Sequence, residues 1–399
     1  MFNIETLNAI ANEGLKTFDL EKYVLDANAS PDGILLRSYG LHDYDFPDSL
    51  KAIARAGAGV NNIPLETCSE RGIVVFNTPG ANANAVKELV LASLFMAARP
   101  IIEGSRWVEG LEGDDVETKV EAGKKAFAGT ELYGKKLGII GLGAIGALVA
   151  NDAIALGMDV TGFDPYVSVD TAWKISKDVK RAITLEEVLA TCDYITVHVP
   201  LRDNTREMFN KETLLLLKQN AVLLNFSRGE LVNQEAICEA LEANQLRMYI
   251  TDFATKKLLQ TEKVRVLPHL GASTEEAETN CALMAARELQ YFLETGSIKN
   301  SVNYPSVDMP YNGHPRIGVC HRNIPNMVGS VTTIVASHTM NIMDLTNRSR
   351  GEYAYTLIDM ERNDSNSLEA IKAELEGVKG ILRVRIIEPL GVTVIAFCQ

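Results

Sequence analysis

Short apolar runs alternate with longer stretches in which apolar residues recur every three or four positions. The short runs predict buried strands, and the periodic stretches predict helices between them. Strands separated by helices pair in parallel, so the pattern indicates an α/β protein with two lobes, each a doubly wound parallel sheet. The strands expected before the long final helix of this region are 33–38, 50–59, 72–77, 135–140, 158–163, 194–199, 221–226, 248–253 and 263–267.

Helical periodicity fills most of the intervals between these strands. The expected helices are 83–98, 147–156, 211–217, 234–244 and 275–295. Residues 99–130 differ, because they are polar and contain five glycines. We expect that segment to be irregular and to form an arm that packs on another subunit.

A different pattern begins after a linker. Residues 303–315 hold three prolines and no periodicity, which is typical of a linker, here placed at 306–315. Beyond it the order of elements predicts a ferredoxin-like βαββαβ module over 316–399. Its expected elements are 316–321, 327–338, 340–348, 353–361, 367–376 and 381–387. The apolar tail 391–399 is expected to pair with an element that the sequence does not specify.

Composition narrows the classes of partner. The formal charge of −13 and the pI near 5.1 argue against nucleic acid or an anionic membrane as a partner. No basic and apolar leader begins the chain, and no apolar run approaches the roughly 20 residues of a membrane span. The six cysteines are scattered and form no C-x-x-C pair, which favours reduced thiols in the cytoplasm and no metal site.

The candidate chemistry begins with a glycine-rich turn between a strand and a helix. Gly141 permits the tight turn, Gly143 lets backbone approach a pyrophosphate, and Gly146 lets the helix pack on the strand. Asp164 lies 21 residues past Gly143 at the end of the next strand, close to the spacing of about 20 for the acid that binds ribose hydroxyls. That carboxylate would repel a 2′-phosphate, so the sequence predicts NAD as cofactor, in preference to NADP.

With further motifs, the chain resembles the D-isomer-specific 2-hydroxyacid dehydrogenase family from about residue 35 to 304. The motifs are Arg55-Ala56-Gly57-Ala58-Gly59-Val60-Asn61-Asn62-Ile63, Asn77-Thr78-Pro79, the glycine turn, His198-Val199-Pro200-Leu201, Asn225-Phe226-Ser227-Arg228-Gly229 and Pro268-His269-Leu270-Gly271-Ala272-Ser273. The resemblance implies an NAD-binding domain over 94–283 and a discontinuous substrate-binding lobe, 1–93 with 284–305. It implies a substrate cleft between the lobes. The C-terminal module resembles an ACT-type regulatory domain.

The same resemblance assigns the cofactor contacts. It places Ala144 and Ile145 at the pyrophosphate, and Thr78 and Asn82 on the nicotinamide side. Further contacts are implied at the adenine-side loop and at the carboxamide, by His198, Pro200 and Asp252.

Oxidation of a 2-hydroxy acid needs a cation for the carboxylate and a group that takes the hydroxyl proton. Arg228 follows a strand, where doubly wound sheets bind ligands, and a guanidinium binds a carboxylate through two hydrogen bonds. His269 also follows a strand, and imidazole can accept and return a proton near neutral pH. We expect Arg228 to bind the carboxylate and His269 to act as acid/base.

One position departs from the family pattern. The family places a carboxylate a few residues after the Asp-Phe that begins at Asp252, and this chain has Lys256 and Lys257 there. A cation beside His269 would disfavour its charged form. Three alternatives remain: Lys257 acts as the acid/base if Arg228 and partial burial favour its neutral form, Glu262 replaces the missing carboxylate, or catalysis is impaired.

A substrate phosphate would require cations in the N-terminal lobe. Arg37 and Arg55 end strands, next to Ser38 and to a glycine loop whose backbone N–H groups suit an anion. The expected substrate-binding residues are Arg37, Ser38, Arg55, Gly57, Ala58 and Gly59. With the ACT-type module, the resemblance implies oxidation of 3-phosphoglycerate to 3-phosphohydroxypyruvate, the first step of serine synthesis, by a homodimer or homotetramer.

In the C-terminal module, His321, Asn323 and Asn341 match residues that clasp an amino acid between two ACT-type modules, which implies serine as an effector. Asn326 stands where such modules usually have a glycine, so the turn is expected to be less open to a ligand. A module that only mediates dimerisation is the alternative.

Two other functions remain open. One is a dehydrogenase of the same family that acts on another 2-hydroxy acid, such as glyoxylate or hydroxypyruvate. The other is an NAD-sensing binding protein with little turnover, which the missing carboxylate would suit.

Overall fold

The structure is a computed structural model that describes residues 1–26, 30–361 and 367–388. The apolar tail 391–399 lies outside the described residues. The chain divides into two compact units, Asn82–Ala277 and Met1–Ala81 with Glu278–Gln399, called here the nucleotide unit and the composite unit. The expected boundaries at 93 and 283 fall inside two helices, α3 (Ala83–Ala98) and α12 (Glu275–Thr295).

The nucleotide unit contains a seven-stranded, wholly parallel sheet with the order β12-β11-β10-β9-β6-β7-β8. Its strands are β6 (Lys136–Ile140), β7 (Asp159–Phe163), β8 (Lys180–Arg181), β9 (Tyr194–Val197), β10 (Ala221–Asn225), β11 (Leu246–Thr251) and β12 (Val264–Val266). The central strands are buried and almost continuously apolar, as strands covered on both faces must be. The doubly wound sheet predicted from the sequence is confirmed.

Helices cover both faces of this sheet and give it two cores. One core joins the sheet to α3 and to α6 (Ala144–Ala155), and the other joins it to the helices of the second face. The remaining helices are α7 (Val169–Ala172), α8 (Leu185–Thr191), α9 (Lys211–Leu215), η2 (Gly229–Leu231), α10 (Gln234–Glu242) and α11 (Lys256–Gln260). The sequence analysis did not predict the short elements β8, α7 and α8.

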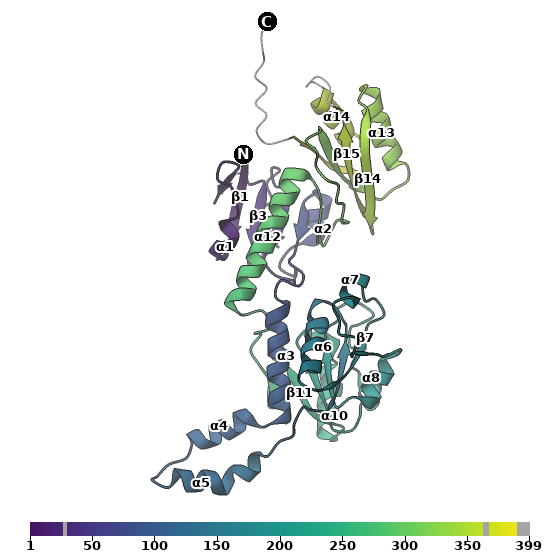
Figure 1. The fold of residues 1–399 in the computed structure, drawn as a ribbon. Coiled ribbons are helices and arrows are strands. Elements are labelled where there is room, and N and C mark those ends of the chain that lie inside the picture. The colour runs from purple at the N-terminus through teal and green to yellow at the C-terminus, as the bar shows by residue number, and fades with distance from the viewer. Residues whose placement is uncertain (27–29, 362–366, 389–399) are drawn as a thin grey trace. The chain divides into compact units, whose positions relative to one another are not determined.

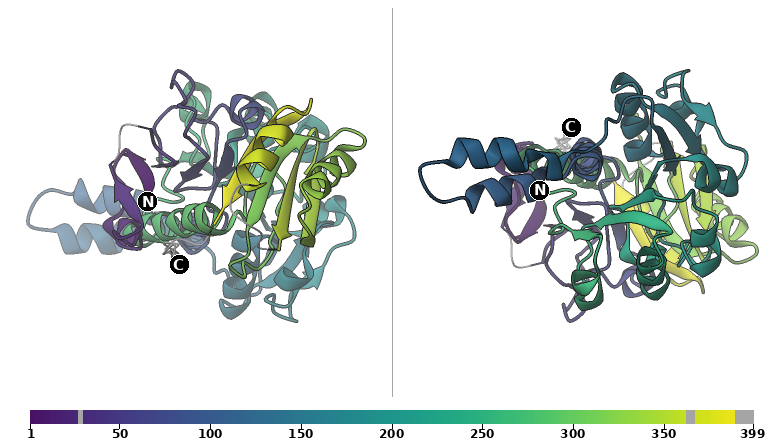
Figure 2. Two further views of the ribbon diagram at one scale, coloured as in Figure 1. Left: turned by 90° about the horizontal axis from the view of Figure 1, so that it is seen from above. Right: turned by 90° about the horizontal axis from the view of Figure 1, so that it is seen from below.

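The segment expected to be irregular is helical instead. It forms α4 (Ile101–Glu109), α5 (Val116–Gly123) and η1 (Lys124–Phe127), an arm that projects from the rest of the unit (Figures 1 and 2). None of its residues is buried. The ring centroids of Trp107 and Phe127 lie 5.2 Å apart within the arm. The glycines misled the prediction, because Gly110 and Gly123 stand at helix ends, where glycine terminates a helix.

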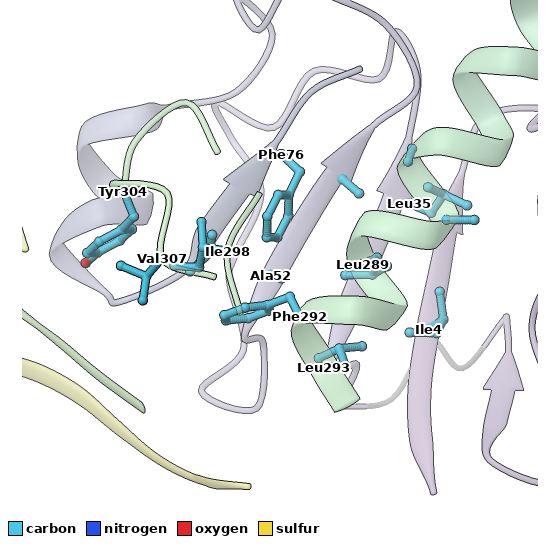
Figure 3. Packing of buried hydrophobic residues seen from close by; sticks show 14 of the residues in the cluster. Ile4, Leu35, Ala52, Phe76, Leu289, Phe292, Leu293, Ile298, Tyr304 and Val307 are labelled. Carbon is cyan, nitrogen blue, oxygen red and sulfur yellow. The ribbon is translucent and has the colours of Figure 1, made fainter. Parts of the chain in front are cut away.

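The composite unit begins with a five-stranded parallel sheet of order β2-β1-β3-β4-β5. Its strands are β1 (Phe2–Leu7), β2 (Tyr23–Leu25), β3 (Gly33–Leu36), β4 (Ala52–Arg55) and β5 (Val74–Phe76), with helices α1 (Asn12–Leu15) and α2 (Leu65–Glu70). The first two strands were not predicted. Helix α12 packs across this sheet through Leu289, Phe292 and Leu293, which Figure 3 shows against side chains of the strands.

The C-terminal module has the predicted ferredoxin-like order, and the prediction is confirmed. Its elements are β13 (Arg316–Arg322), α13 (Met327–Ser337), β14 (Ile342–Arg350), β15 (Tyr353–Met360), α14 (Ser367–Glu376) and β16 (Ile381–Ile387). The strands form an antiparallel sheet with the order β14-β15-β13-β16, and an apolar core lies between this sheet and the two helices. Strand β14 is therefore an edge of the sheet.

This module is anchored to the last turn of α12 by buried polar side chains. Arg385 donates to the Leu293 carbonyl at 3.1 Å, and Tyr355 donates to the Gly296 carbonyl at 2.8 Å. Arg316 donates to the Thr295 carbonyl at 2.9 Å. These donors satisfy carbonyl groups that have no partner within the helix, and two of them are cations at its negative end. The linker thus leads into a module that is hydrogen-bonded to the end of α12.

No helix in the described part of the chain is both long enough and apolar enough to cross a membrane.

Candidate active site

Most of the candidate residues of the nucleotide unit follow strands of its parallel sheet. Since the carboxyl ends of parallel strands lie at one edge, these residues gather there, where ligands bind in such folds. The six positions are Gly141 after β6, Asp164 after β7, His198 after β9, Arg228 after β10, Asp252 after β11 and His269 after β12.

The turn between β6 and α6 needs its glycines. Gly141 has φ 92°, and a Cβ there would lie 2.7 Å from the His198 carbonyl oxygen. A Cβ at Gly146 would lie 2.0 Å from the Gly141 oxygen, so only glycine allows this approach of helix to strand. A Cβ at Gly143 would meet nothing within 4 Å, which leaves its backbone open to a ligand. The turn therefore fits a pyrophosphate.

Backbone groups define the neighbouring phosphate and ribose positions. Ala144 and Ile145 form the first turn of α6, whose N–H groups lack helical partners. The Asp164 carboxylate accepts from the Leu142 N–H at 2.8 Å and from the Tyr166 N–H at 2.8 Å. Two such bonds fix the carboxylate beside the glycine turn, where it can still accept from ribose hydroxyls.

His198 is a structural histidine by its environment. Burial lowers the pKa of its imidazole to about 3, so the ring is neutral at physiological pH. Its Nε2 lies 3.0 Å from the Thr196 hydroxyl, and its buried Nδ1 has no partner in the described structure. Pro200 follows as an exposed residue of the same loop.

Asp252 offers an unused acceptor at the carboxyl end of β11. Its side chain is only 3% exposed; Oδ2 accepts from the Gly271 N–H at 3.3 Å, and Oδ1 has no partner among the described residues. Burial raises the pKa of this carboxyl above its ordinary value, while His269 and Arg228 nearby oppose the shift. A buried unpaired acceptor is costly, so a donor such as the carboxamide of NAD fits here.

Arg228 presents its guanidinium to solvent from a rigid loop. Asn225, fully buried, donates to the Arg228 carbonyl at 2.8 Å, and the Ser227 hydroxyl donates to the Val197 carbonyl at 2.7 Å. The guanidinium makes a short bond to the Ser227 carbonyl at 2.6 Å and keeps further donors for a ligand. The sequence analysis missed Asn225 as the residue that fixes this loop, although it opens the Asn225–Gly229 motif.

His269 is exposed and packs against an aromatic ring. The ring of Phe253 meets the imidazole edge-on, with centroids 5.2 Å apart and planes at 70°. Phe253 also contacts Gly229, where a Cβ would lie 3.3 Å from the Phe253 Cβ. This contact orients the imidazole without a hydrogen bond, and it was not predicted.

Two alternatives for the missing carboxylate meet difficulties in this structure. The Lys257 side chain is 45% exposed and pairs with the Glu235 carboxylate at 3.1 Å, whereas the lysine alternative requires Arg228 as its neighbour. The contact with Lys257 lowers the pKa of Glu235. Glu262 precedes β12, whereas His269 follows it, so the strand separates them to opposite edges of the sheet, which disfavours the alternative in which Glu262 replaces the carboxylate.

In the composite unit, the N-terminal arginine cluster consists of Arg37, Ser38, Arg55 and the loop Gly57, Ala58 and Gly59. Arg55 Nε donates to the Arg37 carbonyl at 2.9 Å, and Gly57 has φ 155°, with the space for a Cβ taken by the Arg55 guanidinium at 2.6 Å. In the described structure, the N–H groups of Ala58 and Gly59 make no intramolecular hydrogen bond. Arg37, Arg55 and Gly57 therefore lie together, beside a loop with open donors.

An unpredicted carboxylate belongs to this cluster. Glu278, near the start of α12, pairs with Arg37 at 2.7 Å. Cys281 lies one turn further, and burial raises the pKa of its thiol while Arg37 and Arg55 oppose the shift. The only sequence signal for Glu278 was an acid in the first turn of a long helix.

The two remaining cofactor candidates lie in different units. Thr78 is fully buried in the composite unit, and its N–H donates to the Gly57 carbonyl at 3.1 Å. Asn82 precedes α3 in the nucleotide unit and makes no side-chain cap bond.

The effector candidates lie at two ends of the module sheet. His321 is 2% exposed, and its Nε2 lies 2.8 Å from the Thr356 hydroxyl, while Asn323 Nδ2 donates to the Gly351 carbonyl at 3.1 Å. Asn341 is exposed at the opposite end, before edge strand β14. Asn326 has φ 64°, so it adopts the left-handed conformation that glycine usually supplies.

Similarity to known proteins identifies the family of this chain. A model of the family described as D-isomer specific 2-hydroxyacid dehydrogenase, NAD binding domain, matches residues 91–271. The D-3-phosphoglycerate dehydrogenase of Escherichia coli K12 is 30% identical over 351 residues, which cover 85% of this chain and 82% of that enzyme. The chain belongs to the D-isomer specific 2-hydroxyacid dehydrogenase family. The glycine turn thus lies in the NAD-binding domain of this family.

Other relatives of the family differ in length or in similarity. The D-3-phosphoglycerate dehydrogenase of Methanocaldococcus jannaschii is 34% identical over 304 residues, and the chain spans 55% of its length, with 75% of this chain covered. The NAD⁺-bound 3-phosphoglycerate dehydrogenase of Entamoeba histolytica matches with TM-score 0.58 and 26% identity, over 76% of this chain and 98% of that one. The D-mandelate dehydrogenase of Rhodotorula graminis, at 21% identity and TM-score 0.63 over 77% and 99% of the two chains, shows the fold alone.

Proposed function

We propose that the protein catalyses the NAD-dependent oxidation of D-3-phosphoglycerate to 3-phosphohydroxypyruvate. The observation that carries the proposal is the gathering of Arg228, Asp252 and His269 at the ends of three adjacent strands in an NAD-binding domain. The substrate follows from the N-terminal arginine cluster and from relatives named D-3-phosphoglycerate dehydrogenase.

Arg228 binds the substrate carboxylate. Its exposed guanidinium can donate two parallel hydrogen bonds, which fix orientation as well as charge. The loop that carries it is fixed by Asn225 and Ser227, so little ordering is left for the moment of binding.

His269 takes the proton from the C2 hydroxyl during oxidation and returns it during reduction. The Phe253 ring restricts the orientation of the imidazole, and the Asp252 carboxyl lies close enough to His269 for an electrostatic interaction. Asp252 thus places a carboxyl group near His269, as the family carboxylate that is missing at Lys257 would do.

Residues of the nucleotide unit would hold NAD, which supplies a nicotinamide that accepts the hydride from C2. The turn Gly141–Gly146 would bind the pyrophosphate, and Asp164 the ribose hydroxyls. The unpaired Oδ1 of Asp252 would accept from the carboxamide.

The N-terminal arginine cluster would bind the phosphate. Arg37 and Arg55 contribute charge, and the N–H groups of Ala58 and Gly59 contribute donors. A phosphate dianion is matched by such a mixture of guanidinium and backbone donors.

A spectrophotometric assay of NADH formation tests the proposal. The purified protein is assayed separately with 3-phosphoglycerate, unphosphorylated D-glycerate and D-lactate, and the rates of NADH formation are compared. We expect kcat/KM for 3-phosphoglycerate to exceed that for glycerate by at least about tenfold, roughly 1.4 kcal/mol. Equal values for both substrates would refute the phosphate assignment.

One observation favours a second candidate, a dehydrogenase or reductase for another 2-hydroxy acid such as glyoxylate or hydroxypyruvate. Arg37 already has Glu278 as an anionic partner, which reduces the charge available to a phosphate. Turnover of hydroxypyruvate with NADH, without activity on 3-phosphohydroxypyruvate, would support this candidate.

We further propose that the C-terminal module is an ACT-type domain that binds serine and inhibits the enzyme. His321 and Asn323 lie at one end of its sheet and Asn341 at the other, on the edge strand. Antiparallel alignment of β14 edges from two copies would bring Asn341 of each copy toward His321 of the other. Such a site would require a homodimer or a homotetramer.

Titration of serine against activity and thermal stability tests this regulation, with Asn341→Ala as the comparison variant. Serine must bind one state of the enzyme better than another to inhibit it. The absence of any change at millimolar serine would leave the module as an assembly device. The exposed apolar residues Ile101 and Val108 of the arm suit a second interface between copies, which sedimentation of an arm variant would test.

A further inference from the structure

A carboxylate lies within the N-terminal arginine cluster, where a phosphate would bind. Glu278 Oε1 is 2.7 Å from the Arg37 guanidinium, and the two side chains are 42% and 39% exposed. The pair is thus open to solvent and to a ligand, and no rearrangement of the core is needed to separate it.

The position of Glu278 holds its charge in place. It occupies the first turn of α12, where the positive end of the helix dipole stabilises a carboxylate. Cys281, one turn further along the helix, contacts the same arginines electrostatically. The start of α12 therefore forms one wall of the cluster.

The opposite side of Arg37 is fixed by its backbone. Its carbonyl accepts from Arg55 Nε at 2.9 Å and from Asn62 Nδ2 at 3.3 Å. A guanidinium has five N–H donors, and Glu278 takes only one edge of it. Arg37 can therefore reach an anion while Glu278 stays close, but the anion then lies beside a like charge.

We propose that Glu278 is a specificity-determining residue, the internal counter-ion with which the substrate phosphate competes for Arg37. It sets the affinity of the site for phosphorylated relative to unphosphorylated 2-hydroxy acids. The inference rests on the proposed phosphate-binding role of the N-terminal arginine cluster. Glu278 keeps the empty cluster charge-balanced and limits how tightly a phosphate is retained.

The variant Glu278→Gln separates charge from position. Glutamine keeps an oxygen that accepts from Arg37, but it removes the negative charge. Exposed ion pairs contribute modestly, so we expect an effect of about fivefold. The dissociation constant for inorganic phosphate should fall by about fivefold, and the ratio of kcat/KM for 3-phosphoglycerate to that for D-glycerate should rise by a similar factor.

Glu276→Gln is the matched control. Glu276 is exposed on the same helix two positions earlier, a spacing that places it on a different face of α12. It removes one negative charge from the same helix end, and neither measured quantity should change. Equal effects of the two variants would refute a specific competition at Arg37 and indicate a general change of the helix charge.

Calorimetric titration of inorganic phosphate, beside the two kinetic assays, separates the failure of this inference from the failure of the proposed function. Tighter phosphate binding in Glu278→Gln without turnover of 3-phosphoglycerate would support the role of Glu278 and refute the proposed substrate. Turnover of 3-phosphoglycerate with unchanged or weaker phosphate binding in Glu278→Gln would overturn the inference about Glu278. Raising the salt concentration should reduce the difference between variant and wild type.

Discussion

The two units use arginine in opposite ways. In the nucleotide unit, Arg228 follows a strand, is exposed, and keeps most of its donors free of the protein. In the composite unit, Arg316 is fully buried, and its guanidinium bonds Asp359 at 2.5 and 2.8 Å and three backbone carbonyls at 2.8–3.0 Å. The first cation is open to a ligand, as its proposed role requires, and the second holds the C-terminal module to α12.

Arg37 lies between these two cases. It is half-exposed and has one carboxylate partner, Glu278, while other donors remain. The comparison indicates that the number of donors left unused, more than the presence of an arginine, separates a ligand-binding cation from a structural one. Two predictions test this distinction, and the first concerns the exposed groups.

Substitution of the exposed groups should remove turnover and leave folding intact. We expect His269→Ala to reduce kcat by about 10²- to 10⁴-fold, because it removes the proposed acid/base. Arg228→Met should reduce kcat/KM for the hydroxy acid by a comparable factor, with NAD affinity unchanged. Lys257→Ala should be mild, since that lysine pairs with Glu235 at the surface. A severe loss with Lys257→Ala and a mild one with His269→Ala would transfer the proton role to the lysine.

Substitution of the buried arginine should reduce stability and leave the exposed groups unaltered. Arg316→Met leaves Asp359 buried without its partner, which should cost about 3–5 kcal/mol of the free energy of unfolding. Denaturant unfolding followed by circular dichroism should detect this loss. Tryptophan fluorescence should change little, because Trp107 and Trp173 both lie in the nucleotide unit. Arg228→Met is the control, with an expected change within about 0.5 kcal/mol; similar losses in the two variants would break the comparison.

The sequence predicted the nucleotide unit better than the composite unit, for a physical reason. Gly141, Asp164, Arg228 and His269 each follow an apolar run, so their place at one sheet edge follows from local pattern and parallel topology. The structure adds the unpaired Oδ1 of Asp252, which depends on packing around a single atom. No local pattern reports such a detail.

The composite unit depends on contacts between distant segments. Glu278 meets Arg37 from 241 positions away, and Tyr355 meets Gly296 from 59 positions away. Glu278 reads as an ordinary surface acid of a long helix in the sequence, and Arg385 reads as an exposed strand residue. Their roles depend on tertiary contacts, which strand and helix periodicity do not encode.

A smaller effect is expected for cofactor choice. Asp164 is held by two backbone N–H groups beside the glycine turn, so its carboxylate cannot easily move away from a 2′-phosphate. We expect a preference for NAD over NADP of at least about tenfold, roughly 1.4 kcal/mol. Measurement of kcat/KM with each cofactor gives the ratio, and Asp164→Ser should reduce it. Equal use of the two cofactors by the unaltered protein would contradict the assignment of Asp164.

A further prediction concerns a buried carboxyl of α12. Glu288 is 9% exposed, accepts from Asn300 at 2.6 Å, and has its pKa raised by burial to about 8 from an ordinary 4.5. The folded protein keeps a proton that the unfolded chain loses between about pH 4.5 and 8. Stability should therefore fall as pH rises through this window and level off above it.

Glu288→Gln should flatten that fall, because an amide does not titrate. The measurement is the midpoint of thermal unfolding of the composite unit at several pH values from 4.5 to 8.5, with the exposed Glu276→Gln as control. Parallel pH profiles for Glu288→Gln and the wild type would show that Glu288 does not hold the extra proton.

The central claim is that Arg228 and His269 present a 2-hydroxy acid for hydride transfer to NAD. The most direct test uses 3-phosphoglycerate that carries deuterium at C2, with mass analysis of the reduced nucleotide. We predict that deuterium appears in NADH with the wild type, and that deuterated NADH forms about 10²- to 10⁴-fold more slowly with His269→Ala. Binding of NAD without any deuterated NADH would contradict the account and support an NAD-sensing protein with little turnover.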